Sequence, residues 1–142
     1  MKIVLDANII IACLLGSRGK LTIITSQNHK LYAPKTIINE IRKYKAKICS
    51  KAEYESENFD RNLEALLFFI NIVEAEEYNK YLGKAEEAIK ERDIKDTDIK
   101  DTDYIACALA VNADFIWSDD KDFSSQNLVA IKNTEEFIEG NR

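Results

Sequence analysis

Apolar residues along the chain follow two alternating patterns, short continuous runs and longer segments with helical spacing. The continuous runs predict strands, and apolar residues that recur every three or four positions predict helices. Strands are expected at residues 2–6, 30–33, 72–73, 114–118 and 128–131. Helices are expected at residues 7–15, 21–26, 34–48, 51–70, 76–91, 104–111 and 135–138. Because strands alternate with helices, the pattern predicts an α/β fold with a central, mainly parallel sheet of four to five strands.

The composition is that of an acidic globular protein. The chain has 142 residues, 46% of them apolar and 32% charged, which fits a single domain spanning residues 1–142. Its formal net charge of −5 excludes a protein that grips nucleic acid with its whole surface. The apolar runs are too short to span a bilayer, and the first residues lack the pattern of a signal peptide. We therefore expect a cytoplasmic protein without a membrane partner.

Cysteine and histidine are too sparse for their usual chemistry. The three cysteines are widely spaced and include no Cys-x-x-Cys pair, and His29 is the only histidine. This pattern argues against a disulfide framework and against a structural zinc site. It also excludes a histidine-based catalytic triad unless His29 serves in it. We expect His29 to be an ordinary surface residue.

Acidic residues follow two of the expected strands. Asp6 comes directly after the run Ile3-Val4-Leu5, and Asn8 is placed to orient its carboxylate by a hydrogen bond. Because open parallel sheets gather their sites at the carboxyl ends of strands, Asp6 should lie near the residues that follow the strand at 114–118. That strand ends in a hydroxyl and three carboxylates: Ser118, Asp119, Asp120 and Asp122.

Two further candidate acids come from expected helices. Glu40 lies three residues after Ile37 and four before Tyr44, on the flank of the apolar stripe that runs from Pro34 to Ile48. Asp101 lies four residues before Ile105, so a helix that extends back this far would bring it onto the buried stripe.

Asp101 belongs to a duplicated pentapeptide, Ile-Lys-Asp-Thr-Asp, at residues 94–98 and 99–103. A shift of five residues rotates a helical position by about 140°, so both copies cannot point inward. We choose Asp101 for its distance to the apolar helix and keep Asp98 and Asp103 as supporting candidates.

Each acid alone also fits a structural role. Asp6 could end a strand, Glu40 could pair with Lys43 on a solvated face, and Asp101 could cap a helix. Gathered together, however, two carboxylates ~4 Å apart repel by ~4 kcal/mol at an effective dielectric of ~20. Such a cluster takes up protons or binds cations, and oxygen ligands without His or Cys favour Mg²⁺ or Mn²⁺.

Four segments of the chain, taken in order, resemble the PIN-domain nucleases, and specifically the small VapC-type toxins of toxin–antitoxin pairs. The segments are residues 3–8, 34–41, 101–109 and 113–123. The resemblance implies a three-layer α/β/α sandwich, Mg²⁺- or Mn²⁺-dependent hydrolysis of RNA by metal-activated water, a homodimer, and inhibition by a small antitoxin protein. It places the catalytic and metal-binding acids of the family on Asp6, Glu40, Asp101 and Asp120.

The same resemblance assigns supporting positions. The small hydroxyl that precedes the fourth acid falls on Ser118, and Asp122 is a candidate fifth ligand. Asn8, Asp98 and Asp103 complete the supporting set. Trp117 departs from the family, whose strand usually carries an aliphatic residue there, and we expect it to pack at the edge of the sheet.

A basic segment that follows Glu40 is the candidate substrate-binding patch. Lys43, Lys47 and Lys51 repeat every four residues and would share one face of a continuous helix. Cations of this kind contact a phosphate backbone, and an aromatic among them can stack on a base. The residues expected to bind RNA are Arg42, Lys43, Tyr44 and Lys47. The alternative is a solvated helix face without a ligand.

Other classes of protein fit the chain less well. A phosphatase of the haloacid-dehalogenase type needs a second Asp two residues after the first, where this chain has Asn8. A receiver-like phosphoacceptor domain needs an acceptor Asp at the end of the central strand, and residues 72–74 provide none. The alternative within the same fold is a catalytically idle PIN-like module that binds RNA or protein. The complete set of four acids argues against it.

Overall fold

A five-stranded parallel sheet forms the centre of the computed structural model, which describes residues 1–90, 100–120, 123 and 126–140. The strands follow the order β3-β2-β1-β4-β5 across the sheet. They are β1 (Lys2–Leu5), β2 (Lys30–Pro34), β3 (Asn71–Val73), β4 (Phe115–Trp117) and β5 (Ile131–Lys132). The prediction of an α/β fold with a parallel sheet of four to five strands is confirmed.

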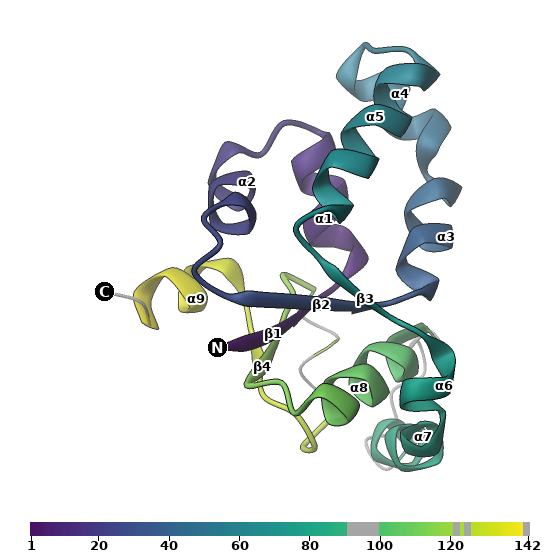
Figure 1. Ribbon diagram of the computed structural model, residues 1–142, viewed down its shortest axis with the longest axis vertical. Coiled ribbons are helices and arrows are strands. Elements are labelled where there is room, and N and C mark those ends of the chain that lie inside the picture. The colour runs from purple at the N-terminus through teal and green to yellow at the C-terminus, as the bar shows by residue number, and fades with distance from the viewer. Residues whose placement is uncertain (91–99, 121–122, 124–125, 141–142) are drawn as a thin grey trace.

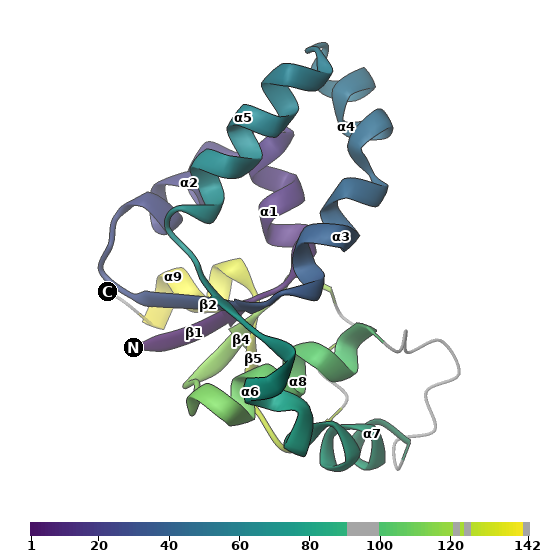
Figure 2. The same ribbon diagram turned by 45° about the vertical axis from the view of Figure 1, so that its right-hand side comes forward.

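Helices cover both faces of the sheet, which confirms the three-layer α/β/α sandwich (Figure 1). One layer contains α1 (Ala7–Leu14), α2 (Arg18–Thr25), α3 (Thr36–Lys43), α4 (Lys45–Ala52) and α5 (Ser56–Leu67). The other contains α6 (Ala75–Tyr78), the 3₁₀ turn η1 (Asn79–Tyr81), α7 (Leu82–Lys90) and α8 (Lys100–Val111). Helix α8 lies directly against β1, β2 and β4, and the last helix, α9 (Thr134–Gly140), contacts β5 (Figure 2).

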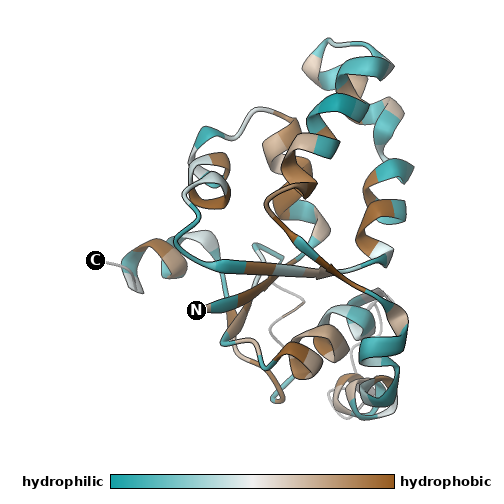
Figure 3. Cartoon of the chain, viewed as in Figure 1, coloured by the Kyte–Doolittle hydropathy of each residue, from teal (hydrophilic) through white to brown (hydrophobic). Residues whose placement is uncertain are grey.

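The core follows the apolar runs of the sequence. Ile3, Val4 and Leu5 of β1 are fully buried, and Figure 3 shows hydrophobic residues on the strands and on the part of α5 near the sheet. Trp117 on β4 is also fully buried, and its indole N–H donates to the Thr134 hydroxyl at 2.9 Å. Because β4 lies between β1 and β5, the expectation that Trp117 packs at the sheet edge was wrong.

The helix expected from Pro34 to Ile48 is divided in two. Pro34 ends β2 and is paired in register with Val73, so it does not open a helix. Tyr44, with φ −98° and ψ 7°, separates α3 from α4. The bend lets Ile48 enter the core while Tyr44 remains 45% exposed. Lys45 is held there by Asp60, 2.9 Å away on α5, a tertiary contact that helical periodicity does not encode.

Other boundaries differ for local reasons. The helix expected at 51–70 is interrupted at Glu53, which has φ +57°, and resumes as α5. The helix expected at 76–91 consists of α6, η1 and α7, and the last strand covers Ile131–Lys132 instead of residues 128–131. Helix α8 begins at Lys100, so Asp101 lies in its first turn. Asp98 and Asp122 lie outside the described residues.

Within the described part of the chain, no single helix is long and apolar enough to cross a membrane. Helices α1 and α2 reach the required length and composition only as a pair, and that pair is bent by 115°.

Candidate active site

The pairing of β1 with β4 brings Asp6 and Ser118 side by side. Leu5 is paired with Trp117, and the Asp6 N–H donates to the Trp117 carbonyl at 3.2 Å. The next residue, Ser118, donates its hydroxyl to Asp6 Oδ2. The other carboxylate oxygen, Oδ1, accepts from the Ile9 N–H at 3.2 Å, so that Asp6 caps α1. Strand register therefore fixes the orientation of the Asp6 carboxylate.

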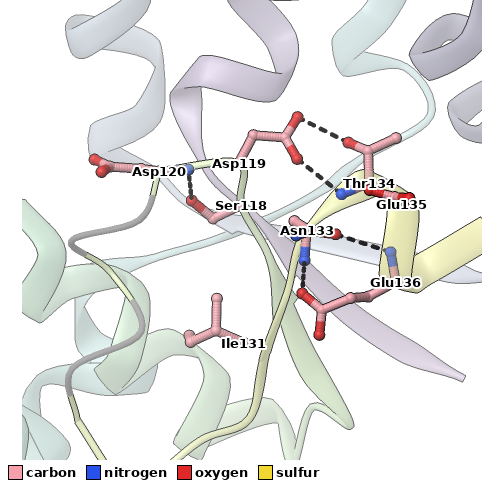
Figure 4. Close-up of a pocket in the computed structure, with 8 residues that line it drawn as sticks. All are labelled: Ser118, Asp119, Asp120, Ile131, Asn133, Thr134, Glu135 and Glu136. Atoms are coloured by element: carbon pink, nitrogen blue, oxygen red, sulfur yellow. Dashed lines mark hydrogen bonds between the residues drawn. The ribbon is translucent and has the colours of Figure 1, made fainter.

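Asp120 joins this pair through Ser118. The Asp120 N–H donates to the Ser118 hydroxyl oxygen at 3.1 Å, and Figure 4 shows the Asp120 side chain directed away from Asp119. The negative charge of Asp120 acts on Asp6 and raises its pKa. The structure thus brings together two of the acids predicted from strand ends.

The Asp6 carboxyl has a pKa of about 6, well above its ordinary value of 3.8. Burial is the largest cause, since the side chain is 5% exposed. Hydrogen bonds from Ser118 and Ile9 lower the pKa, and the charge of Asp120 raises it again. Burial and the Asp120 charge both favour the protonated form of this carboxyl. The carboxylate therefore needs a proton or an added cation to balance its charge near neutral pH.

Glu40 and Asp101 approach the same region around the Tyr104 hydroxyl. Tyr104 lies on α8 and is 1% exposed. Burial is the main cause that raises the pKa of its phenol, and the negative charges of Glu40 and Asp6 raise it further. The charge of Asp101 acts in the same direction. All three carboxylates therefore lie close enough to act electrostatically on one buried hydroxyl.

Sequence analysis did not single out Tyr104. Its signal was a polar aromatic residue three positions after Asp101, on the buried stripe of the same helix. Only the packing of α8 against β1 and β2 shows that this hydroxyl points among the acids.

Two supporting residues are placed differently from expectation. Asn8 is exposed, and it acts on Asp6 through its backbone N–H, so the expected hydrogen bond from its side chain was wrong. Asp103 accepts a hydrogen bond of 3.4 Å from the Tyr78 hydroxyl on α6. Burial and the Asp103 charge raise the pKa of Tyr78 to about 12. Asp103 therefore helps to join α8 to α6.

The donor set fits a hard divalent cation in its chemistry. Asp6, Glu40, Asp101 and Asp120 offer only carboxylate oxygens, the ligands that Mg²⁺ and Mn²⁺ prefer. In the described ranges, no three His, Cys, Asp or Glu side chains are arranged as a metal site. The four carboxylates share a region but do not converge on one point. Their mutual repulsion accounts for this.

A groove beside the acids contains part of the basic segment. It has a volume of about 230 Å³ and is lined by Asn8, Ile11, Leu15, Tyr44, Lys47, Ile48 and Lys51. Lys43 lies on α3 and Lys47 on α4, so the single face expected for Lys43, Lys47 and Lys51 was wrong. Nη1 of Arg42 lies 3.9 Å from Oδ1 of Asp60 on α5.

The sequence matches the model of one known protein family. A family model described as the PIN domain matches residues 4–139. No curated protein matches the sequence.

Solved structures share the fold at low sequence identity. VapBC2 from Rickettsia felis, bound to a DNA fragment from its promoter, is 15% identical with a TM-score of 0.73, over 94% of this chain and 98% of that one. PAE2754 from Pyrobaculum aerophilum is 16% identical with a TM-score of 0.69, over 99% and 88%. VapBC-1 from nontypeable Haemophilus influenzae is 20% identical with a TM-score of 0.68, over 94% and 98%.

Proposed function

Because the chain belongs to the PIN-domain family, we propose that it is a metal-dependent endoribonuclease that hydrolyses RNA phosphodiesters. The residues that would hold Mg²⁺ or Mn²⁺ are Asp6, Glu40, Asp101 and Asp120. When bound, the ion supplies an activated water and neutralises charge that develops on the phosphodiester.

The observation that carries this proposal is the buried Asp6 carboxylate. Burial and the charge of nearby Asp120 raise its pKa to about 6. A buried carboxylate destabilises the folded protein when it ionises, so its placement needs a compensating function. Ser118 and the Ile9 N–H keep it oriented, and together with Asp120 they supply a prearranged half of a cation site.

The proposal is tested by incubating RNA with the protein in Mg²⁺, in Mn²⁺ and in excess EDTA. Cleavage is expected with either ion and should disappear with EDTA. Metal binding without cleavage of any RNA tested would support the idle binding module instead.

We further propose that single-stranded RNA reaches the acids along the groove between α1 and α4. Tyr44 is 45% exposed there and offers a ring on which a base can stack, while Lys47 and Lys51 offer cations for phosphates. Asn8, two residues after Asp6 in the chain, is among the residues that line this groove. Arg42 already lies beside Asp60. We therefore assign the contacts with RNA phosphates to Lys47 and Lys51 of α4.

Replacing Lys47 with Glu is expected to weaken RNA binding several-fold. The loss of one phosphate contact should also reduce the slope of log affinity against log salt by about 0.7. Fluorescence anisotropy with labelled RNA over a range of salt concentrations measures both quantities. Lys84→Glu makes the same charge change on the exposed side of α7, in the other helical layer, and is the matched control. Equal effects of the two variants would show that general charge, and not this groove, governs binding.

The partners that we propose are a small antitoxin protein and a second copy of this chain. The antitoxin proposal rests on the likeness to VapBC2 and VapBC-1. The second copy is assigned to an apolar surface at the end of α5, where Phe68 is 82% exposed. Arg61, Glu64, Ala65 and Phe69 line the same surface pocket. Two such surfaces related by a two-fold axis can place the Arg61 of each copy near the Glu64 of the other.

Phe68→Asp is expected to convert the dimer to a monomer, because a charge would be buried at the centre of the apolar contact. Sedimentation equilibrium measures the change. Ile138→Asp, on the exposed side of α9, is the control and should leave the dimer intact. A parent protein that sediments as a monomer at every concentration would refute the assignment.

A further inference from the structure

Asp119 turns away from Asp120 and toward Thr134 at the start of α9 (Figure 4). Its Oδ1 accepts from the Thr134 N–H at 2.7 Å, and its Oδ2 accepts from the Thr134 hydroxyl at 2.8 Å. The Lys20 ammonium on α2 lies 3.3 Å from the same Oδ2. We call this set of contacts the Asp119 clamp. It joins the loop that carries Asp120 to two helices distant in sequence.

The clamp continues into the core through Trp117. The fully buried Trp117 donates its indole N–H to the Thr134 hydroxyl oxygen, which in turn donates to Asp119. Burial raises the pKa of Asp119, but the hydrogen bonds from Thr134 and the Lys20 charge outweigh burial and hold that pKa below its ordinary value. Both carboxylate oxygens of Asp119 are therefore engaged, by Thr134 and by Lys20.

Asp119 sits between the two residues that act on Asp6. Ser118 donates its hydroxyl to Asp6 and accepts the N–H of Asp120, while Asp120 acts on Asp6 by charge. Asp119 is bonded to Thr134 while Ser118 is bonded to Asp6, so the two neighbouring side chains are held by different partners. Because Asp119 lies between Ser118 and Asp120 in the chain, anchoring it to α9 restrains both.

We propose that Asp119 is a positioning residue, whose clamp holds Ser118 and Asp120 in the arrangement that receives the divalent cation. This proposal rests on the proposed nuclease function. It also assigns different roles to neighbouring carboxylates, because both oxygens of Asp119 are bonded to Thr134, whereas the charge of Asp120 acts on Asp6.

Asp119→Ala tests the proposal against a control that weakens the same helix. The control is Glu136→Ala, which removes a reciprocal cap at the start of α9. In that cap, Glu136 Oε1 accepts from the Asn133 N–H at 3.2 Å, and Asn133 Oδ1 accepts from the Glu136 N–H at 2.8 Å. Both variants loosen the start of α9, but only Asp119→Ala releases the loop of Ser118 and Asp120.

The expected results separate positioning from general stability. In Asp119→Ala the dissociation constant for Mn²⁺, measured by calorimetry, should rise about tenfold, with kcat for RNA reduced 10- to 100-fold and KM little changed. Glu136→Ala should keep the parent values of all three. Parent-like Mn²⁺ affinity in Asp119→Ala, or equal losses in both variants, would overturn the proposal.

Thr134 provides a second pair of variants if Asp119→Ala does not fold. Thr134→Val removes the hydroxyl that joins Trp117 to Asp119 and should weaken Mn²⁺ binding, while Thr134→Ser keeps the hydroxyl and should restore it. Equal Mn²⁺ affinity in these two variants would contradict the clamp. If the parent cleaves RNA with Mg²⁺ while the Asp119 and Thr134 variants match it, only the positioning role fails. A parent that neither binds Mn²⁺ nor cleaves RNA overturns the proposed function and the positioning role together.

Discussion

Asp6→Asn is expected to reduce metal-dependent RNA cleavage by about 1,000-fold, equivalent to about 4 kcal/mol of lost transition-state stabilisation. The amide keeps the shape of the carboxylate. Its oxygen can still accept from the Ile9 N–H and its NH2 can donate to the Ser118 hydroxyl oxygen, so the fold should survive. It cannot supply the negative charge that balances a divalent cation. The measurement is kcat/KM on a labelled RNA in Mg²⁺ and in Mn²⁺.

Asp114→Asn is the matched control for this experiment. Asp114 lies just before β4, and its Oδ2 accepts from the Lys2 N–H at 2.8 Å, at the end of the sheet opposite the acids. The same chemical change there should leave kcat/KM at the parent value. Undiminished cleavage by Asp6→Asn would remove Asp6 from the site.

The second large effect of Asp6→Asn is on stability. The substitution that lowers cleavage is expected to raise the free energy of unfolding. The folded-state pKa of Asp6, about 6, exceeds its ordinary value of 3.8, so the folded protein holds the Asp6 proton more tightly than the unfolded chain. The resulting stabilisation is complete below pH ~4 and is lost as pH rises through about 6, by ~3 kcal/mol in total. Because Asn does not titrate, Asp6→Asn should be more stable than the parent at pH 7, by up to ~3 kcal/mol.

Urea unfolding of metal-free protein between pH 4 and pH 8 measures this effect. The parent should lose stability across the interval relative to the variant, and the two should converge at low pH. Saturating Mg²⁺ should then stabilise the parent alone, because a ligand that binds only the folded state raises its stability. Parallel stability profiles without added metal would show that Asp6 ionises in the fold at no cost.

The parts of the site that follow from strand ends were predictable from the sequence. The run Ile3-Val4-Leu5 defines β1, and residues 115–117 define β4, so parallel pairing alone places Asp6 beside the segment with Ser118 and Asp120. The position of Asp101 also followed, because the apolar spacing of α8 continues back to its first turn. These features depend on the local period of the chain.

The parts that depend on contacts between distant side chains were not predictable. The division of the helix at Tyr44 accompanies the ion pair of Lys45 with Asp60 on α5, and the pattern of isoleucines continues through it without a break. In the same way, the role of Asp119 depends on where α9 begins, and that of Tyr104 on where α8 packs. Each residue type fits an ordinary structural role when only the sequence is known.

The most direct measurement of the central claim is anomalous diffraction from crystals of the parent protein soaked in Mn²⁺. A peak is expected in contact with the carboxylates of Asp6 and Asp120, with Glu40 and Asp101 drawn toward it, and the peak should be absent from Asp6→Asn. A fully soaked parent crystal with no Mn²⁺ peak among these four acids would contradict the account.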